Sequence, residues 1–303
     1  MDGEHEPTNG HATTPGSGGP MHVQRDSTVD AYLRRAGEFL EAHEAENNLM
    51  FGICSQIRAD PSQYESLYFA TVVHGDKVVG SAIRTAPWRL ILAVMDHPGA
   101  VHRLVHDVAG QELPGVVGPM DVADAFAEAW ARGSGGTTRR NRSTRAFRLE
   151  RVIPPRPANG TMVVAGEEHR AVLREWWEAF HVEAIGPGGP GSDYDAAVER
   201  VIRRIGRTVY LWFDDGRPVS LAGAGGLTPH GIRIGPVYTP PELRGRGYAS
   251  NLVAEVSQLQ LDDGRTFVFL FTDLANPTAN KIYQSIGYEP VIDFTEWDFG
   301  SES

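Results

Sequence analysis

Residues 237–249, VYTPPELRGRGYA, form the most informative stretch of the sequence. An apolar strand ends at a pair of prolines, and a helix is predicted to begin inside the loop that follows. Gly245 and Gly247 lack a Cβ atom, so a bulky anion can approach the backbone closely. The first turn of a helix also leaves N–H groups without partners and carries partial positive charge. This stretch therefore predicts a pyrophosphate site, with Arg244 and Arg246 as additional charged donors. The alternative is an ordinary turn between a strand and a helix, with solvated arginines.

A second segment, residues 276–288 (NPTANKIYQSIGY), carries chemical groups at helical spacing. Asn276 precedes a proline that suits the first position of a helix, so its side chain can cap that helix or bind an amide-containing ligand. Tyr283 lies about two helical turns further on, so both side chains can face one ligand. A tyrosine hydroxyl can protonate a leaving group of elevated pKa, such as a thiolate. The alternative is that Tyr283 is a core side chain of an amphipathic helix.

Together the two segments resemble the GNAT superfamily of acyl-CoA-dependent N-acyltransferases. The sequence RGRGYA at residues 244–249 matches the family's pyrophosphate signature, Arg/Gln-x-x-Gly-x-Gly/Ala. The pattern that follows it in the family is matched by Asn276, Ala279, Tyr283, Gly287 and Tyr288. The resemblance covers about residues 160–300, including the order of helices and strands. Residues 28–155 resemble, more loosely, the N-terminal half of two-domain bacterial members, and they lack the CoA signature.

The resemblance implies a site and a mechanism. Acetyl-CoA, or another acyl-CoA, would lie where strand 232–239 separates from strand 267–272. The donor-binding residues would be Val237, Tyr238, Thr239, Arg244, Gly245, Arg246, Gly247, Tyr248, Ala249, Asn276 and Ala279. A primary amine on a small molecule would attack the thioester directly, and an N–H near Val237 or Tyr238 would stabilise the oxyanion. Tyr283 would protonate the departing thiolate.

The general base is the least defined part of this predicted site. An ammonium acceptor must lose a proton before it can attack the thioester. Glu183 is the candidate base, because it ends a predicted helix rich in aromatic side chains. A glutamate near a helix end is also commonly a solvated surface residue. Glu175, His181 or a chain of water molecules are the other candidates.

The chain has 303 residues, which suggests two domains, and its pattern predicts an α+β fold. Residues 160–303 give the order β-α-α-β-β-β-α-β-α-β-β, a mixed, mostly antiparallel sheet flanked by helices. Residues 28–155 give a similar but shorter order, α-β-β-β-α-β-α-β, so we expect a tandem GNAT-like arrangement. The second domain would be catalytic, and the first would shape the acceptor cleft. Residues 1–27 are expected to be a disordered tail.

Composition and charge exclude several classes of protein. No stretch approaches the ~20 consecutive apolar residues of a transmembrane helix, and residues 1–27 lack a signal-peptide core. The formal net charge of −11 disfavours binding to DNA. The single cysteine, Cys54, cannot form an intramolecular disulfide, which favours the cytoplasm. We therefore expect a cytoplasmic, bacterial-type enzyme without a membrane partner, as a monomer or homodimer.

Two other binding patterns are weaker. Gly245 and Gly247 also begin a dinucleotide-binding pattern, but Ser250 stands at the third glycine position and the required acidic residue is missing. No Walker pattern for ATP is present. His102 and His106 have the spacing of metal ligands, but the other residues of a metal motif are missing, so we expect no metal.

Alternative functions depend partly on a basic segment. Residues 133–145 (GSGGTTRRNRSTR) are predicted to form a loop that is solvated or contacts RNA or the adenosine phosphate of CoA, through Arg139, Arg140, Arg142 and Arg145. One alternative is an acyltransferase whose donor is an aminoacyl-tRNA or a carrier protein. The other is a non-catalytic sensor that binds acyl-CoA. Salt-sensitive binding of tRNA would favour the first alternative.

Overall fold

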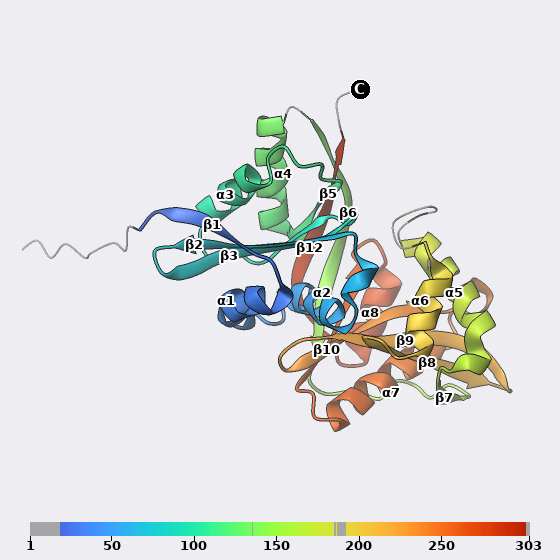
Figure 1. Ribbon diagram of the computed structural model, residues 1–303. Helices are drawn as coiled ribbons and strands as arrows, with labels where there is room; N and C mark the ends of the chain where they lie inside the picture. Colours follow the sequence, from blue (N-terminus) through green and yellow to red (C-terminus); the bar gives the residue numbers. More distant parts are fainter. Residues whose placement is uncertain (1–18, 135, 185, 187–191, 301–303) are drawn as a thin grey trace, which may run out of the picture.

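A computed structural model of the protein describes residues 19–134, 136–184, 186 and 192–300. These residues form one twelve-stranded sheet with helices on both faces (Figure 1). The sheet is mostly antiparallel, with parallel pairs between β4 and β5 and between β10 and β11. The predicted α+β class is therefore confirmed. Residues 1–18 of the expected tail lie outside the described part of the chain.

The first half of the chain contains the strands and helices β1 (Met21–Asp26), α1 (Val29–Glu41), α2 (Asn48–Ala59), β2 (Ser66–His74), β3 (Lys77–Ala86), β4 (Leu90–Leu92), α3 (Gly99–Asp107), β5 (Gly115–Pro119), α4 (Met120–Ser134) and β6 (Thr137–Leu149). The second half contains β7 (Thr161–Val164), α5 (Arg170–Ala184), α6 (Tyr194–Ile202), β8 (Arg207–Asp214), β9 (Arg217–Leu227), β10 (Gly231–Tyr238), α7 (Tyr248–Asp262), β11 (Phe267–Asp273), α8 (Pro277–Ser285) and β12 (Glu289–Gly300). Short 3₁₀ helices occur at η1 (Pro61–Gln63), η2 (Glu167–His169) and η3 (Pro241–Leu243).

Both halves have the same order, β-α-α-β-β-β-α-β-α-β, which is the structural signature of a duplicated fold. The sequence-based order for the first half lacked β1 and α2. Ordered structure was expected to begin near Thr28, and this was wrong, because Met21–Asp26 pair antiparallel with β2 as an edge strand. In the second half the two predicted closing strands are one continuous strand, β12.

The two halves exchange their last strands. The sheet order is β1-β2-β3-β4-β5-β12-β6-β11-β10-β9-β8-β7. β12, the last strand of the chain, pairs with β5 of the first half, and β6 of the first half pairs with β11 of the second. The segment between the two expected domains, residues 156–159, lies between β6 and β7. Each half nevertheless supplies the strand that completes the sheet of the other.

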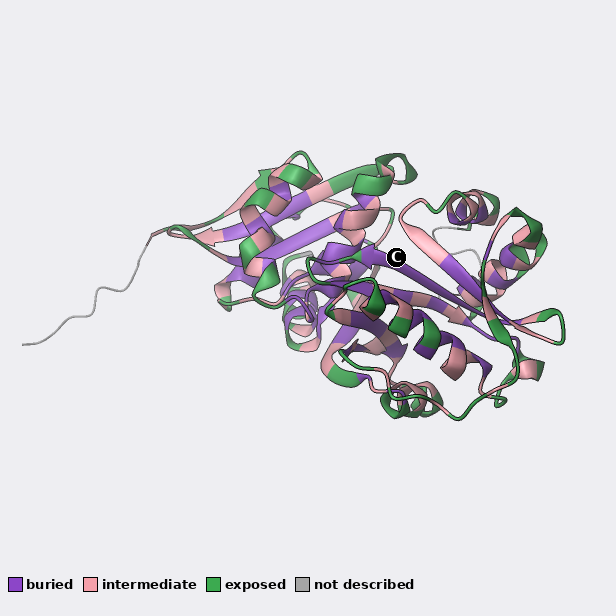
Figure 2. Cartoon of the chain, turned by 90° about the horizontal axis from the view of Figure 1, so that it is seen from below, coloured by how far each residue is buried: buried purple, intermediate pink, exposed green. Residues whose placement is uncertain are grey.

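Helices cover both faces of each half-sheet. Neighbouring residues of β2, Phe69 and Ala70, belong to different buried clusters, one with α1 and α2 and the other with α3 and α4. In β8, Leu211 packs with α5 and α6, whereas Tyr210 packs with α7. This alternation is the expected period of two for a sheet buried on both faces. Figure 2 shows buried residues along the strands and exposed residues on the outer faces of the helices.

Local sequence signals explain several element boundaries. The Thr28 hydroxyl accepts a hydrogen bond from the Ala31 N–H and caps α1. Asp193 caps α6 in the same way, by accepting a hydrogen bond from the Ala196 N–H. The turn between β8 and β9 has positive φ at Asp215 and Gly216, the conformation that suits two-residue hairpins.

The basic segment is not a loop, which corrects the sequence-based expectation. Residues 137–149 form β6, which lies between β12 and β11. Four of its arginines form ion pairs with carboxylates: Arg139 with Asp298, Arg140 with Asp124, Arg142 with Glu296 and Arg145 with Asp293. Because most of these carboxylates are on β12, they come close only after the strand exchange.

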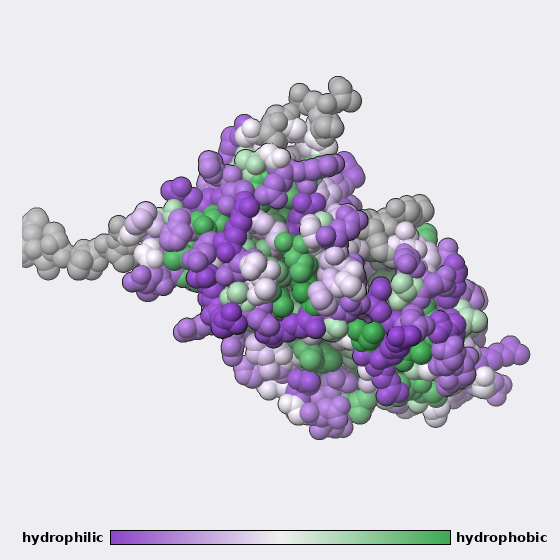
Figure 3. All heavy atoms as spheres, in the orientation of Figure 1, coloured by the Kyte–Doolittle hydropathy of each residue, from purple (hydrophilic) through white to green (hydrophobic). Residues whose placement is uncertain are grey.

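The surface carries both hydrophilic and hydrophobic residues. On the face shown in Figure 3, hydrophilic residues predominate and hydrophobic residues are exposed in small groups. The large apolar side chains that are exposed are those of Leu67, Ile153, Val163, Val164, Val182 and Leu227. No helix among the described residues combines the length and the hydropathy needed to cross a membrane.

A buried carboxylate connects the two halves. Glu44, between α1 and α2, accepts hydrogen bonds from Thr228 Oγ1 at 2.5 Å and from the His230 N–H at 2.8 Å. Its second oxygen lies 2.7 Å from His230 Nδ1. The hydrogen bond with Glu44 and its negative charge raise the pKa of His230 above the usual value.

The raised pKa of His230 predicts a pH-dependent contribution to stability. His230 binds its proton more tightly in the folded than in the unfolded state, so the contribution is complete below the unfolded pKa, about 6.5. It is lost as the pH rises through the higher folded pKa. We expect the difference in melting temperature between wild type and His230→Gln to be largest near pH 5.5 and to shrink towards pH 9. A difference that grows with pH would contradict this assignment.

Candidate functional site

A gap opens between two neighbouring strands of the second half. β10 and β11 run parallel but pair only at their beginnings, the last pair being Arg233 with Phe269. Both strands continue for several residues without further pairing to each other in the described chain. The register between β10 and β9 also shifts between Ile234 and Val237. The expected separation of these strands is present, and it leaves backbone groups of β10 facing the gap.

One backbone N–H of β10 faces the gap at the position where the family resemblance implied an oxyanion donor. Val237 and Tyr238 pair with Ala222 and Leu221 of β9. Because successive N–H groups of a strand point to opposite sides, one of these two N–H groups points towards the gap. The next residue, Thr239, contacts the glycine loop: its carbonyl oxygen accepts a hydrogen bond from Arg244 Nε at 2.9 Å.

The glycine loop leads from this gap into α7. Gly245 and Gly247 have φ values of 79° and 84°, in the region that favours glycine. A Cβ atom on Gly245 would meet no atom within 4 Å, so the loop is open on that side. Gly247 is the N-cap of α7 and offers no side-chain acceptor. Among the described residues, no hydrogen-bond acceptor serves the N–H groups of Tyr248, Ala249 or Ser250.

The corresponding loop of the first half is built differently. It joins β4 to α3, and the N–H of Gly99, the first residue of α3, donates to His97 Nδ1 at 3.0 Å. The N-cap is Pro98. The His97 side chain therefore accepts a hydrogen bond at the start of α3. At the start of α7, by contrast, the N–H groups have no such acceptor among the described residues. The duplicated fold thus has, in the part of the chain that is described, one open helix N-terminus of this kind, in the second half.

The predicted pantetheine and acid residues lie on α8. Asn276 Oδ1 accepts the Ala279 N–H at 3.0 Å, so its oxygen caps the helix. Burial raises the pKa of Tyr283 to about 12. Its ring packs edge-on against Tyr288, with 6.0 Å between centroids, and its hydroxyl has no partner among the described residues. Val237 and Tyr283 pack against the same buried cluster under α7.

The candidate base contacts the first arginine of the glycine loop. Glu183, near the end of α5, accepts hydrogen bonds from Arg244 Nη2 at 2.8 and 2.9 Å, and both side chains are about half exposed. Arg246 is also exposed, and its Nη2 lies 3.4 Å from the Glu242 carbonyl oxygen. The structure therefore brings Glu183 to the predicted pyrophosphate site. His181 is buried against the Tyr194 ring.

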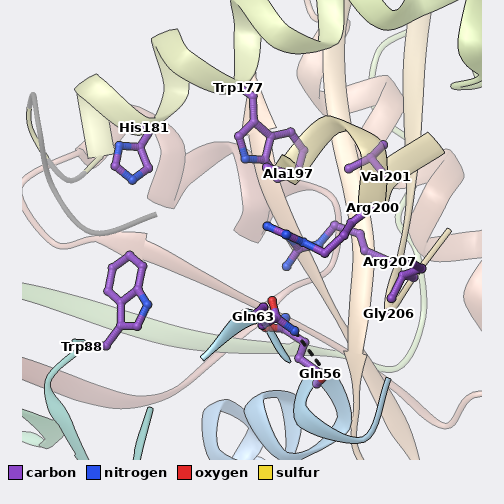
Figure 4. Close-up of a pocket in the computed structure, with 11 residues that line it drawn as sticks. Gln56, Gln63, Trp88, Trp177, His181, Ala197, Arg200, Val201, Gly206 and Arg207 are labelled. Carbon is purple, nitrogen blue, oxygen red and sulfur yellow. Dashed lines mark hydrogen bonds between the residues drawn. The ribbon is translucent and has the colours of Figure 1, made fainter. Parts of the chain in front are cut away.

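A cavity between the halves was not identified from the sequence. It has a volume of about 200 Å³ and lies between α2 and η1 of the first half and α5, α6 and β8 of the second (Figure 4). It is lined by Gln56, Gln63, Trp88, Trp177, His181, Ala197, Arg200, Val201, Ile205, Gly206 and Arg207. A larger cavity of about 710 Å³ adjoins it and shares Gln56, Gln63, Trp88 and Arg200. Because α2 was missed, the wall that it forms could not be predicted.

Comparisons with known proteins agree with this geometry. Residues 170–288 match the model of the acetyltransferase (GNAT) family. No protein among the curated ones matches the sequence significantly.

Solved structures resemble the whole described fold. A Drosophila protein aligns with a TM-score of 0.65 at 14% identity, over 93% of this chain and 99% of that chain. A GNAT acetyltransferase from Colwellia psychrerythraea aligns with a TM-score of 0.54 at 12% identity, over 92% and 99%. A tandem GNAT protein from the clavulanic acid biosynthesis pathway aligns with a TM-score of 0.55 at 14% identity, over 93% and 98%. At these identities the likeness concerns the fold. The chain therefore has a tandem of two GNAT-like folds, and residues 170–288 in its second half match the model of the acetyltransferase (GNAT) family.

Proposed function

We propose that the protein is an N-acyltransferase that transfers an acyl group from acetyl-CoA to a primary amine on a small molecule. The observation that carries the proposal is the open N-terminus of α7, which follows two glycines of positive φ beside the gap between β10 and β11. Unsatisfied N–H groups and the helix dipole favour a bound pyrophosphate at such a position. The signature residues 244–249 match this role.

The residues of the gap would divide the chemistry between them. The donor supplies an activated thioester. The N–H of Val237 or Tyr238 that faces the gap would donate a hydrogen bond to the developing oxyanion. Tyr283 would protonate the departing thiolate, because a pKa of about 12 keeps its hydroxyl protonated at neutral pH. The amide nitrogen of Asn276, whose oxygen is engaged in the helix cap, would bind the pantetheine arm.

Glu183 as the base requires an exchange of partners. Its two hydrogen bonds come from Arg244, which belongs to the pyrophosphate signature. Arg244 would turn to the pyrophosphate when the donor binds, since an arginine binds phosphate oxygens through the same fork. The Glu183 carboxylate would then be free to accept a proton from the acceptor ammonium.

The ion pairs of the β6 arginines weigh against a tRNA donor. Each of the four arginines that the tRNA alternative would use already has a carboxylate partner. A nucleic acid would have to displace these partners to gain the same contacts.

The first test is the melting temperature with acetyl-CoA, CoA, NAD and ATP. A ligand present at a hundredfold excess over its Kd stabilises the folded state by about 2.7 kcal/mol. We expect clear stabilisation by acetyl-CoA and CoA, and none by NAD. Equal stabilisation by all four ligands, or none by acetyl-CoA, would contradict the proposed donor and would make charged tRNA the next ligand to test.

A further inference from the structure

The cavity between the halves, called here the arginine cavity, is positively charged. Among its lining residues are Arg200 and Arg207, and no aspartate or glutamate of the described chain. The chain as a whole has a net charge of −11. Figure 4 shows the two arginine side chains next to each other below Trp177, with Gln56 and Gln63 on the opposite wall. A carboxylate-free pair of arginines in an acidic protein indicates a site for an anion.

Arg207 has no anionic partner among the described residues. Its Nε is buried without a hydrogen-bond acceptor, and its guanidinium lies 5.9 Å from the centre of the Trp177 ring. Arg233 also has a buried nitrogen, Nη1, without a hydrogen-bond acceptor among the described residues. Burial lowers the pKa of each to about 10, and the neighbouring positive charges act in the same direction, Arg200 on Arg207 and Arg207 on Arg233. Three adjacent cations are thus held together without compensation by the described residues.

The carboxylates of the adjoining cavity are used elsewhere. Asp60 accepts the Ser62 N–H at the start of η1, and Asp193 accepts the Ala196 N–H at the start of α6. Glu296 is paired with Arg142 at 2.7 Å. None of them neutralises Arg200 or Arg207. An uncompensated buried charge destabilises a fold, and a bound anion removes this cost.

The arginine cavity lies beside the start of the gap between β10 and β11. Arg207 packs over Gly223 of β9, where a Cβ atom would lie 3.0 Å from Arg207 Cδ and 2.9 Å from the Gly235 carbonyl oxygen. These two atoms are therefore less than about 6 Å apart. Gly235 is in the irregular part of β10, two residues beyond the last pair with β11.

The arginine cavity is on the face of the sheet opposite α7, the helix whose start is the proposed pyrophosphate site. Tyr238 and Leu221 belong to the cluster covered by α5 and α6, on the face opposite α7. Gly223 is two residues from Leu221 in β9, so Arg207 lies on that same face. An amine placed at the β10 irregularity could therefore carry a second group that reaches the arginines.

We propose that Arg200 and Arg207 bind an anionic group, a carboxylate or a phosphate, carried by the same small molecule as the reacting amine. The acceptor class is then amino acids or amino phosphates and not polyamines. This inference depends on the proposed acyltransferase function. Arginine suits the role because its planar fork binds carboxylate and phosphate oxygens in pairs. The volume of about 200 Å³ limits this part of the acceptor to a small group.

Matched acceptors test the proposal directly. Each of several amino acids is compared with its own amide, and phosphoethanolamine is compared with ethanolamine, with spermidine as the cationic control. Release of free CoA thiol is measured at saturating acetyl-CoA. We expect kcat/KM for the anionic member of the preferred pair to exceed that of the neutral member by about 100-fold, the value of one or two charge-assisted hydrogen bonds. The pair with the larger ratio distinguishes carboxylate from phosphate. Equal or faster reaction of the amides, ethanolamine or spermidine would overturn the proposal.

Variants connect this preference to the two arginines. Arg200→Gln and Arg207→Gln should raise the KM for the anionic acceptor at least about tenfold and bring the acid-to-amide ratio towards one, with the Kd for acetyl-CoA unchanged. Arg203→Gln is the matched control. Arg203 directly follows α6, the helix that carries Arg200, and it pairs with Glu199 outside the arginine cavity. Arg207→Lys should restore part of the preference. An unchanged ratio in both glutamine variants would contradict the proposal.

Stability adds a readout that a merely structural role would not give. Without ligand, Arg207→Gln should melt at or above the wild-type temperature, because an unpaired buried charge is removed. If acetyl-CoA does not bind the wild type, the proposed function fails and this inference fails with it. If acetyl-CoA binds and is turned over without preference for anionic amines, only this inference is wrong.

Discussion

Gly245→Leu is expected to weaken acetyl-CoA binding by at least about 100-fold. The leucine side chain would fill the open side of the loop and would keep the pyrophosphate from the free N–H groups at the start of α7. Each hydrogen bond to a charged group contributes about 1.5–3 kcal/mol, and about 1.4 kcal/mol corresponds to tenfold in Kd. Loss of two such bonds gives the expected effect. Isothermal titration with acetyl-CoA measures it.

Gly264→Leu is the matched control for this substitution. Gly264 follows α7 at its other end and has a φ of 91°, and a Cβ atom added there would likewise meet no atom within 4 Å. Both variants carry a similar strain of roughly 1–2 kcal/mol for a left-handed leucine. Their melting temperatures should therefore fall together, whereas only Gly245→Leu should lose affinity. Equal affinity of the two variants would refute the assignment of the loop.

Tyr283→Phe is expected to lower kcat by about 10²–10⁴-fold, the usual contribution of a general acid. The Kd for acetyl-CoA should stay at the wild-type value, because the hydroxyl makes no contact that holds the loop or α8 in the described chain. The melting temperature should also be unchanged, since the hydroxyl has no partner among the described residues. With a pKa of about 12, Tyr283 stays protonated, so it should cause no fall in wild-type kcat between pH 7 and pH 10.

Tyr288→Phe is the matched control for Tyr283→Phe, because Tyr288 is a neighbouring tyrosine with a structural hydrogen bond. The Tyr288 hydroxyl lies 2.8 Å from Ser257 Oγ in the core, so its loss should lower stability by about 1 kcal/mol without a comparable loss of turnover. Wild-type turnover in Tyr283→Phe at every pH would rule out Tyr283 as the acid. Loss of turnover in Tyr283→Phe with retained acetyl-CoA binding would distinguish an enzyme from a sensor that only binds the donor.

The local geometry of the proposed donor site was predictable because its determinants are close together in the sequence. Two glycines, a strand end and a helix start lie within residues 237–249, and their backbone conformations are those that the sequence favours. Asn276 caps the short helix α8 and Tyr283 lies on it, so the helix fixes their relative positions. The resemblance to a known family added the order of elements in the second half.

The features that the sequence did not predict depend on contacts between residues far apart in the chain. β1 has little apolar sequence and is a strand because it pairs with β2. The arginines of β6 meet Asp293, Glu296 and Asp298 only through the exchange of strands between the halves. The arginine cavity needs α2 of the first half to pack against β9 and β10 of the second. None of these contacts has a signal within a short window of the sequence.

Calorimetric titration of the full chain with acetyl-CoA tests the central claim most directly. The start of α7 is open, whereas the start of α3 is occupied by His97. We predict one acetyl-CoA site per chain, lost in Gly245→Leu and retained in Gly264→Leu. Two sites per chain, or no binding at all, would contradict the claim that the second half alone carries the donor site.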